Sequence, residues 1–433
     1  MSRIAPLKGM RDFYPDAMRV RRWMASRWRD VAERFGFEEV DAPLLEPLEL
    51  YTRKSGDEIA GQLYVFEDRG GRAVALRPEM TPSLARMVAA RSQGLPKPIR
   101  WYSIPRLFRY ERPQRGRLRE FFQLNLDILG VPGIEADAEI IAAGVDVLRA
   151  CGLEADDFAV RYSDRRLLDA VLDGLGLAAE SHPAVFAALD RLPRSGPGEG
   201  AAALTRLGVD GPTAAVLLEA TGARDLAALQ RALAPRGIDL TEAAGRLDQL
   251  ATYLTAYGVG GYCAFDPGIV RGLAYYTGVV FEMHDRAGAL RALCGGGRYD
   301  DLLAAFGGEP LPAVGFGLGD AVLQELLTAR GRLPAPGPAL DAYVAPLAPS
   351  DRAAAIAVAG RLRDAGLRTD LALIDQSRAR HHKRAEAVGA RVAVLVGGET
   401  PTGQVAVRAL ATGKETVGPL EALIASLRHT PPC

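Results

Sequence analysis

The chain has 433 residues, of which 48% are hydrophobic, and its 53 basic side chains are balanced by 53 acidic ones. This length exceeds a single hydrophobic core, so two or three domains are expected. The zero net charge disfavours general nucleic-acid binding and restricts any such contact to a local basic patch. No apolar run approaches the ~20 residues of a membrane helix, and residues 1–4 lack a signal-peptide pattern, so a cytoplasmic protein with no membrane partner is expected.

Cysteine and histidine side chains are not spaced for chemistry. The cysteines include no CxxC pair, so neither a zinc site nor a disulfide framework is predicted. No histidine spacing suggests a metal ligand or a nucleophile–base pair, so no metal site is predicted from these side chains. The residues concerned are Cys151, Cys263, Cys294, Cys433, His182, His284, His381, His382 and His429.

The first third of the chain mixes helical and extended patterns. A helical pattern over residues 18–34 ends at Phe35-Gly36, where glycine is a plausible helix stop. Segments rich in β-branched and aromatic residues predict strands at 99–109, 121–129 and 279–284, and a further helix is expected at 136–148. This mixture predicts an α+β fold with an antiparallel sheet.

Composition divides the chain into four parts. Residues 1–164 and 258–330 carry the strand patterns and form the expected core domain. Residues 165–257 are Ala/Leu-rich and predict a helical insertion, interrupted by the tract RSGPGEG. Residues 331–340 contain LPAPGP, which reads as a stiff linker. Residues 341–433 alternate strands and helices and predict a small α/β domain with a largely parallel sheet.

The stretch FRYERPQRGRLREFFQ, residues 108–123, concentrates five arginines in this neutral chain. It reads as a hairpin with strands at 107–111 and 119–128 and the tip RPQRGRL between them. Guanidinium groups hold phosphate oxygens bidentately, so an anion site is one interpretation, and a solvated hairpin is the other. The arginines are Arg109, Arg112, Arg115, Arg117 and Arg119.

Alternation on the returning strand separates two faces. Phe122, Leu124, Leu126 and Ile128 share one face and predict core. Gln123, Asn125 and Asp127 share the other face, which suits the lining of a polar site.

Three further stretches carry candidate site residues. ALRPEMTPSLA places Glu79 and Thr81 at a proline-restrained turn before a helix, which is also an ordinary helix start. VRGLAYYTG places Arg271, Tyr275 and Tyr276 at the head of a strand. CGGGRYDDLL has three glycines that permit close backbone approach to a ligand or simply form a turn. No GxxxxGK[ST] loop is present, so any nucleotide would bind in another manner.

Together these stretches resemble the histidyl-tRNA synthetases, a branch of the class II aminoacyl-tRNA synthetases. The resemblance rests on GMRDFYP, the motif 1-like VDAPLLEP, LRPEMT, the arginine-rich hairpin, RGLAYYT and GGGRYD, in that order over nearly the whole chain. It implies the class II antiparallel sheet flanked by helices, a helical insertion, and a C-terminal α/β domain similar to the anticodon-binding domain.

The resemblance also implies a reaction. A histidine–tRNA ligase activates L-histidine with ATP and Mg²⁺ to histidyl-adenylate and then transfers histidine to tRNA(His). The histidine carboxylate is the nucleophile, so the protein has to position reactants and stabilise charge. A homodimer through the motif 1 region is expected from the family.

Site roles carry over onto the matching residues. The resemblance makes Arg109 and Arg271 the catalytic clamps on the α-phosphate, with Glu111 at the adenine of ATP. The residues expected to bind histidine are Glu79, Thr81, Gln123, Asp127, Tyr275 and Tyr276. The hairpin tip would meet the acceptor end of tRNA through Arg112, Gln114, Arg115 and Arg117.

Two positions depart from the family pattern. Ala274 replaces the acid of the usual Arg-Gly-Leu-Asp-Tyr-Tyr. Val322 stands where motif 3 of most class II enzymes has an arginine that binds the γ-phosphate. Without compensation, the loss of this charged contact costs on the order of 1.5–3 kcal/mol of binding free energy. Arg298 and Arg86 are the candidate replacements. Two rival readings follow, a catalytically silent regulatory subunit of ATP phosphoribosyltransferase and a tRNA-sensing module, and the intact hairpin and C-terminal domain favour the synthetase.

The C-terminal domain carries a basic cluster on its predicted second helix. It would face the anticodon stem of tRNA, or it is a solvated helix face. The cluster comprises Arg378, Arg380, His381, His382, Lys383 and Arg384.

Overall fold

The computed structural model describes residues 4–53, 61–191, 199–223, 225–271, 275–334, 339–398 and 403–429. The chain forms two compact units, Met1–Leu333 and Pro334–Cys433. No helix in these described ranges has both the length and the apolar character needed to cross a bilayer.

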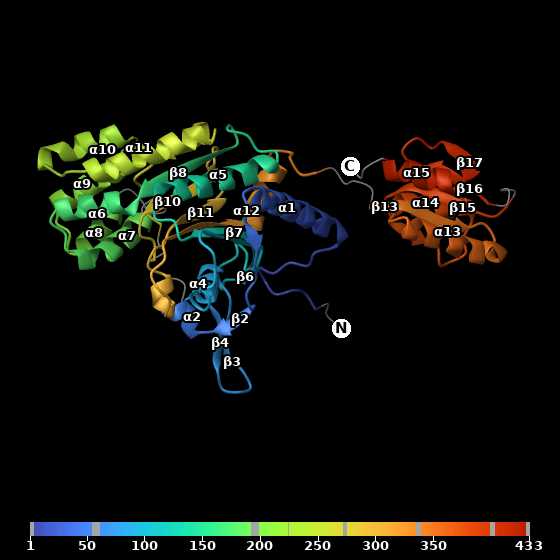
Figure 1. Ribbon diagram of the computed structural model, residues 1–433, viewed down its shortest axis with the longest axis horizontal. Helices are drawn as coiled ribbons and strands as arrows, with labels where there is room; N and C mark the ends of the chain where they lie inside the picture. The colour runs from blue at the N-terminus through green and yellow to red at the C-terminus, as the bar shows by residue number, and fades with distance from the viewer. Residues whose placement is uncertain are drawn as a thin grey trace. The chain divides into compact units, whose positions relative to one another are not determined.

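The first unit is built on a nine-stranded sheet with the strand order β1-β5-β7-β12-β11-β10-β8-β9, and β6 pairs with β7 (Figure 1). All neighbours are antiparallel except β1 with β5 and β8 with β9 at the two edges, so the predicted antiparallel sheet is confirmed. The strands are β1 (Glu38–Glu39), β5 (Ile99–Ser103), β6 (Arg106–Phe108), β7 (Glu120–Leu129), β8 (Phe158–Asp164), β9 (Cys263–Phe265), β10 (Val279–Asp285), β11 (Cys294–Arg298) and β12 (Ala313–Gly319).

The predicted hairpin is present with a shorter first strand. The expected strand at 99–109 is divided into β5 and β6 around Pro105, which has no N–H for the ladder. The N–H of Arg109 donates to the carbonyl of Arg119 at 2.9 Å, and Gln114 pairs with Arg117 across the tip. Residues 109–119 therefore form a hairpin that is closed by individual backbone hydrogen bonds and not by two continuous strands.

One face of the sheet is covered by α1 (Pro15–Arg34) and α5 (Ile134–Ala150) (Figure 1). Helix α1 begins with proline in its first turn, which suits the fixed φ of proline, and ends before Gly36, whose φ is 75°. Leu124, Leu126 and Ile128 of β7 are buried in the same core as these helices. The alternate side chains of β7 therefore point to the opposite face, where the cavity lies.

A second, three-stranded sheet borders that opposite face. Its order is β2-β4-β3, with β2 (Leu45–Pro47), β3 (Tyr64–Glu67) and β4 (Ala73–Leu76). Helices α2 (Glu49–Thr52) and α4 (Thr81–Ala89) pack against each other beside it. Because α4 starts directly after Glu79-Met80, its N-terminus brings the predicted LRPEMT residues to the cavity.

The region after β8 is helical, and its helices gather beside the sheet (Figure 1). Aspartate side chains cap several of these helices: Asp164, Asp210 and Asp225 each accept a backbone N–H of the first turn. The helices are α6 (Arg165–Gly174), α7 (His182–Arg191), α8 (Glu199–Arg206), α9 (Gly211–Thr221), α10 (Leu226–Leu233) and α11 (Thr241–Ala256). Helix α11 packs on α5, so the core of the insertion is continuous with that of the sheet.

The second unit is a five-stranded sheet of order β14-β13-β15-β16-β17. Only the β14-β13-β15 part is parallel, and the prediction of a largely parallel sheet is wrong for β16 and β17. The link from β15 to β16 is too short for a crossover helix, which forces an antiparallel pair. The elements are β13 (Leu340–Pro346), α13 (Arg352–Asp364), β14 (Thr369–Leu371), α14 (Arg378–Ala387), β15 (Ala390–Val396), β16 (Gln404–Ala409), β17 (Glu415–Pro419) and α15 (Leu420–His429).

Candidate active site

A cavity of about 470 Å³ lies on the open face of the large sheet. Strands β7, β10, β11 and β12 form its floor, and the hairpin, the start of α4 and the segment before β10 form its walls. The structure brings ten of the predicted site residues into this one cavity. They are Glu79, Thr81, Arg109, Glu111, Arg117, Gln123, Asp127, Arg271, Tyr275 and Tyr276.

Glu79 and Tyr275 form the first polar pair of the cavity. The Tyr275 hydroxyl donates to Oε2 of Glu79 at 3.0 Å, and Oε1 of Glu79 is buried with no partner within the described ranges. Burial raises the pKa of Glu79, and the positive charges of Arg109 and Arg271 oppose this rise. An acceptor oxygen without a partner, turned to a cavity, suits a cationic or N–H-bearing ligand such as an α-amino group.

Asp127 forms the second pair, with Tyr299. The Tyr299 hydroxyl donates to Oδ1 of Asp127 at 2.6 Å, and burial raises the pKa of Asp127 to about 7. Oδ1 of the neighbouring Asn125 is also buried without a hydrogen-bond partner in the described part of the chain. Tyr299 was not predicted as a site residue, although the motif GGGRYD contains it. Two acceptors beside each other suit the N–H groups of an imidazole.

Glycines in β11 and β12 make room for these side chains. A Cβ added at Gly315 would lie 1.9 Å from Oδ1 of Asp127, and one at Gly317 would lie 1.4 Å from Nε2 of Gln123. A Cβ at Gly295 would lie 2.2 Å from Nη1 of Arg271. The three glycines before Arg298 lie within strand β11, so the interpretation of GGGR as a turn is wrong. Strand β11 has glycines in place of larger residues because side chains from other segments lie across it.

Arg271 has an unusual backbone. Its φ is 59°, and it is the one non-glycine residue with positive φ in the part of the chain that the structure describes. This left-handed conformation costs roughly 1–2 kcal/mol for a residue with a Cβ. Arg165, at the start of α6, supports it by donating to the carbonyls of Arg271 at 2.5 Å and Tyr276 at 3.4 Å. Ala274 lies outside the described residues.

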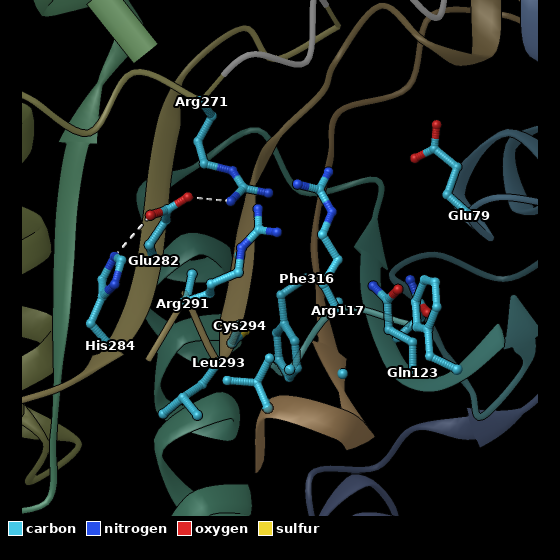
Figure 2. Close-up of a pocket in the computed structure, with 18 of the residues that line it drawn as sticks. Glu79, Arg117, Gln123, Arg271, Glu282, His284, Arg291, Leu293, Cys294 and Phe316 are labelled. Carbon is cyan, nitrogen blue, oxygen red and sulfur yellow. Dashed lines mark hydrogen bonds and ion pairs between the residues drawn. The ribbon is translucent and has the colours of Figure 1, made fainter. Parts of the chain in front are cut away.

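The Arg271 guanidinium belongs to a charged chain that Figure 2 shows along β10. It makes a short ion pair with Glu282, whose other oxygen accepts from Nε2 of His284 at 2.8 Å. Burial would raise the pKa of Glu282, but His284 and Arg271 outweigh it and lower the pKa to about 2. Glu282 and His284 were predicted only as strand residues. Their signal in the sequence is the polar alternation within an apolar strand.

The structure divides the arginines of the hairpin. Nε of Arg109 donates to the carbonyl of Pro78 at 3.0 Å, and its guanidinium carbon lies 5.3 Å from the centre of the Phe121 ring. Arg117 was expected at the tip for tRNA, but it is half-buried, lines the cavity and forms an ion pair with Glu111. Three polar residues of the tip do not line the cavity and are exposed: Arg112, Gln114 and Arg115.

Val322 lies in the first turn of α12 (Asp320–Ala329), where it is buried at the edge of the cavity. A Cβ at Gly116 would lie 3.1 Å from Cγ2 of Val322, so the hairpin tip crosses this position directly. Oε2 of Glu325, one turn further along α12, accepts from Nε of Arg115 at 2.9 Å. The tip is therefore docked on α12 at the place where the family's motif 3 arginine would stand.

Neither candidate replacement for that arginine reaches the cavity. Arg298 is fully buried beneath the sheet and donates to both oxygens of Asp137 from Nε at 3.1 Å. Arg86 forms an ion pair with Glu46 at 2.7 Å. Both guanidinium groups therefore have structural roles, and the expectation that one of them compensates for Val322 is wrong. Arg291, which the sequence did not single out, does line the cavity (Figure 2).

The described residues contain no group of three or more His, Cys, Asp or Glu side chains placed to hold a metal ion. Cys151 and Cys294 are buried free thiols, Cys263 is half-buried, and Cys433 lies outside the described residues.

An antiparallel sheet with helices on one face and an arginine-lined cavity on the other, entered by a motif 2-like hairpin, is the catalytic domain of a class II aminoacyl-tRNA synthetase. A family model described as histidyl-tRNA synthetase matches residues 9–321, and an anticodon binding domain model matches residues 341–430. The chain belongs to the histidyl-tRNA synthetase family.

Individual relatives agree with this assignment. The chain is 44% identical over 431 residues to the histidine–tRNA ligase of Opitutus terrae, covering 99% of each chain. It is 41% identical over 413 residues to the chloroplastic/mitochondrial histidine–tRNA ligase of Arabidopsis thaliana, covering 95% of this chain and 84% of the relative. The crystal structure of histidyl-tRNA synthetase from Nostoc sp. PCC 7120 superposes with a TM-score of 0.82 at 22% identity, covering 99% of both chains, which supports the fold.

Proposed function

We propose that this protein is a histidine–tRNA ligase that activates L-histidine with ATP and transfers it to tRNA(His). The observation that carries the proposal is one cavity lined both by buried acceptors, on Glu79 and Asp127, and by the guanidinium groups of Arg109 and Arg271. The acceptors suit the N–H groups of histidine, and the arginines suit its carboxylate and a phosphate. Family membership supports the same activity.

In the first step an oxygen of the histidine carboxylate attacks the α-phosphorus of ATP. The bond from that phosphorus to the bridging oxygen breaks, and pyrophosphate leaves with the electron pair. Arg109 and Arg271 would bind the α-phosphate and stabilise the charge that develops on it. Glu282 holds the Arg271 guanidinium in place on the strand floor, so the clamp is oriented before substrate arrives.

Mg²⁺ would accompany ATP and neutralise its phosphate oxygens. Such an ion keeps several waters and takes few protein ligands, and Glu111 and Glu282, two carboxylates of the cavity lining, would be its protein partners. Glu111 is held by Arg117 and would also contact the adenine side of the nucleotide.

In the second step a ribose hydroxyl at the end of tRNA attacks the carbonyl carbon of histidyl-adenylate, and AMP leaves. The exposed Arg112, Gln114 and Arg115 at the hairpin tip are the residues we assign to the acceptor end of tRNA. In the second unit, α14 presents an exposed basic face that we assign to the anticodon stem. That face comprises Arg380, Lys383 and Arg384, whereas His381 and His382 are buried and Arg378 is paired with Glu415.

We also propose a cytoplasmic homodimer. Leu44 and Leu45 of the motif 1 region are about two-fifths exposed, and Val65 and Phe66 of β3, at the other edge of the same three-stranded sheet, are about half exposed. Exposed apolar side chains on both edge strands of this small sheet suit burial against a second copy of the chain. A monomer by sedimentation at micromolar concentration would contradict the dimer.

Histidine-dependent exchange of pyrophosphate into ATP, followed by charging of tRNA(His), tests the function. We expect both activities, with no exchange when histidine is omitted. Tight histidine binding without exchange or charging, at high protein concentration, would favour the regulatory-subunit alternative instead.

A further inference from the structure

We propose that Arg291 binds the terminal phosphates of ATP and so replaces the arginine that motif 3 lacks at Val322. The inference rests on the proposed function, because it assigns a further binding residue to the same cavity. It concerns the β- and γ-phosphates, which become the pyrophosphate product, while Arg109 and Arg271 remain on the α-phosphate.

The position of Arg291 follows from the strand order. Arg291 lies in the connection between β10 and β11, and two residues later the N–H of Leu293 donates to the carbonyl of Met283 at 2.7 Å. The carbonyl of Leu293 in turn accepts from the N–H of Gly319 at 3.4 Å. Gly319 is the residue directly before α12. The connection that carries Arg291 therefore runs beside the N-terminus of the helix that carries Val322, and both residues line the cavity.

The direction of the side chain agrees with this role. In Figure 2 the guanidinium groups of Arg117, Arg271 and Arg291 are turned into the same part of the cavity. These groups come from the hairpin, from the segment before β10 and from the β10–β11 connection, so no local sequence pattern requires them to converge. Arg117 is paired with Glu111 and Arg271 with Glu282, so these two guanidinium groups are held in place. Several guanidinium groups turned to one region suit the many oxygens of a polyanion such as triphosphate.

The site of the missing arginine cannot itself supply the charge. Val322 is apolar and packs against Gly116 of the hairpin tip, which crosses this first turn of α12. Arg298 is enclosed by Asp137 and Asp300. Arg86 is held by Glu46, and neither of these two arginines is on the cavity wall. Arg291 is the arginine that the neighbouring connection places on that wall.

The test compares Arg291→Ala with the wild type in pyrophosphate exchange. Loss of one charge-assisted contact is expected to raise the KM for ATP and for pyrophosphate by about 10- to 100-fold. The KM for histidine and the inhibition constant of AMP are expected to stay within about threefold, because neither ligand has β- or γ-phosphates. Arg291→Lys keeps the charge but loses the bidentate geometry of the guanidinium group, so its KM for ATP is expected to lie between those of the wild type and Arg291→Ala.

Arg286→Ala is the matched control. It removes the same charge from the same β10–β11 connection, but Arg286 is exposed, donates to the carbonyl of Ala155 and does not line the cavity. Its KM for ATP is expected to remain near that of the wild type. The proposal would be overturned if Arg291→Ala has near-normal KM values for ATP and pyrophosphate, or if it loses affinity for ATP and AMP equally.

Calorimetry with ATP and AMP separates this inference from the proposed function. Absence of exchange activity in the wild type would contradict the proposed ligase function. The phosphate site would still be supported if the wild type binds ATP more tightly than AMP and Arg291→Ala does not. If Arg291→Ala does not fold, Arg291→Lys and Arg291→Gln supply the same comparison. Loss of histidine binding in all three variants would identify Arg291 as structural and overturn the assignment.

Discussion

Replacing Asp127 by asparagine should stabilise the protein while weakening histidine binding. The carboxyl group is buried, and its desolvation raises its pKa from 3.8 to about 7. Asparagine has nearly the same shape, keeps an oxygen that can accept from Tyr299, and carries no charge to desolvate. The gain in stability is therefore tied to pH, because it reflects only the ionised form of the aspartate.

The sign and size follow from proton linkage. Between pH 4 and 7 the unfolded chain has lost the Asp127 proton while the folded chain keeps it, so the wild type loses stability as pH rises. Above about pH 7 both states are ionised, and the loss is constant. From pH 5 to pH 8 the free energy of unfolding of Asp127→Asn minus that of the wild type should rise by about 3 kcal/mol, as two pKa units correspond to ~2.7 kcal/mol.

Urea unfolding, monitored by tryptophan fluorescence, measures the difference in the free energy of unfolding for the first unit alone. All three tryptophans, Trp23, Trp28 and Trp101, lie in the first unit, so the second unit does not contribute to the signal. A difference that stays constant from pH 5 to pH 8 would refute the reasoning, because an uncharged or solvated Asp127 would have no desolvation cost to relieve.

The same residue should control the pH dependence of substrate binding. The ionised carboxylate of Asp127 accepts hydrogen bonds from the imidazole of histidine, whereas the protonated carboxyl group must first lose its proton. The affinity for histidine, measured by calorimetry, should therefore rise from pH 6 to pH 8 in the wild type. In Asp127→Asn the affinity should be lower, and the part of its pH dependence centred near 7 should disappear. Equal affinities and pH profiles in the two proteins would remove Asp127 from the histidine site.

Three further predictions concern other parts of the site. Arg271→Ala should abolish pyrophosphate exchange with an unchanged circular dichroism spectrum, and near-normal exchange would remove Arg271 from its assigned role. Gly317→Ala should raise the KM for histidine about tenfold by displacing the Gln123 amide, whereas Gly319→Ala, with open space around its added Cβ, should not. Alanine at all three positions of the exposed α14 face should weaken tRNA affinity and flatten its salt dependence while leaving exchange intact; unchanged affinity would contradict that assignment. The three positions are Arg380, Lys383 and Arg384.

The sequence was sufficient for the elements whose pattern is local. The alternation of β7 separated core side chains from Gln123 and Asp127, and both faces are as predicted. Helix α1 was predicted to within a few residues because its apolar period and its glycine stop lie within one segment. In such cases the information that determines the structure is contained in neighbouring residues.

The remainder depends on pairing between distant segments. Three of the five residues of strand β11 are glycine, which disfavours strands locally, and the strand forms because β10 and β12 pair with both of its edges. Its glycines are required by side chains that come from elsewhere, such as Arg271 over Gly295. Tyr299 was missed for the same reason, since its partner Asp127 becomes a neighbour only through the strand order. Glu282 was missed because its partner Arg271 lies outside any strand, in the segment before β10.

The connection between the helical insertion and the reaction is a consequence of this arrangement. Arg165 begins α6, and its buried guanidinium donates to the carbonyl of Arg271, whose left-handed backbone needs external support. The next residue, Arg166, donates to the carbonyl of Thr277 at 3.3 Å and forms an ion pair with Asp300. The first turn of the insertion thus contacts both ends of the segment that carries Arg271, the residue that we propose as an α-phosphate clamp. A displacement of α6 would move Arg271 relative to Arg109, so the insertion is part of the scaffold of the active site as well as an appended domain.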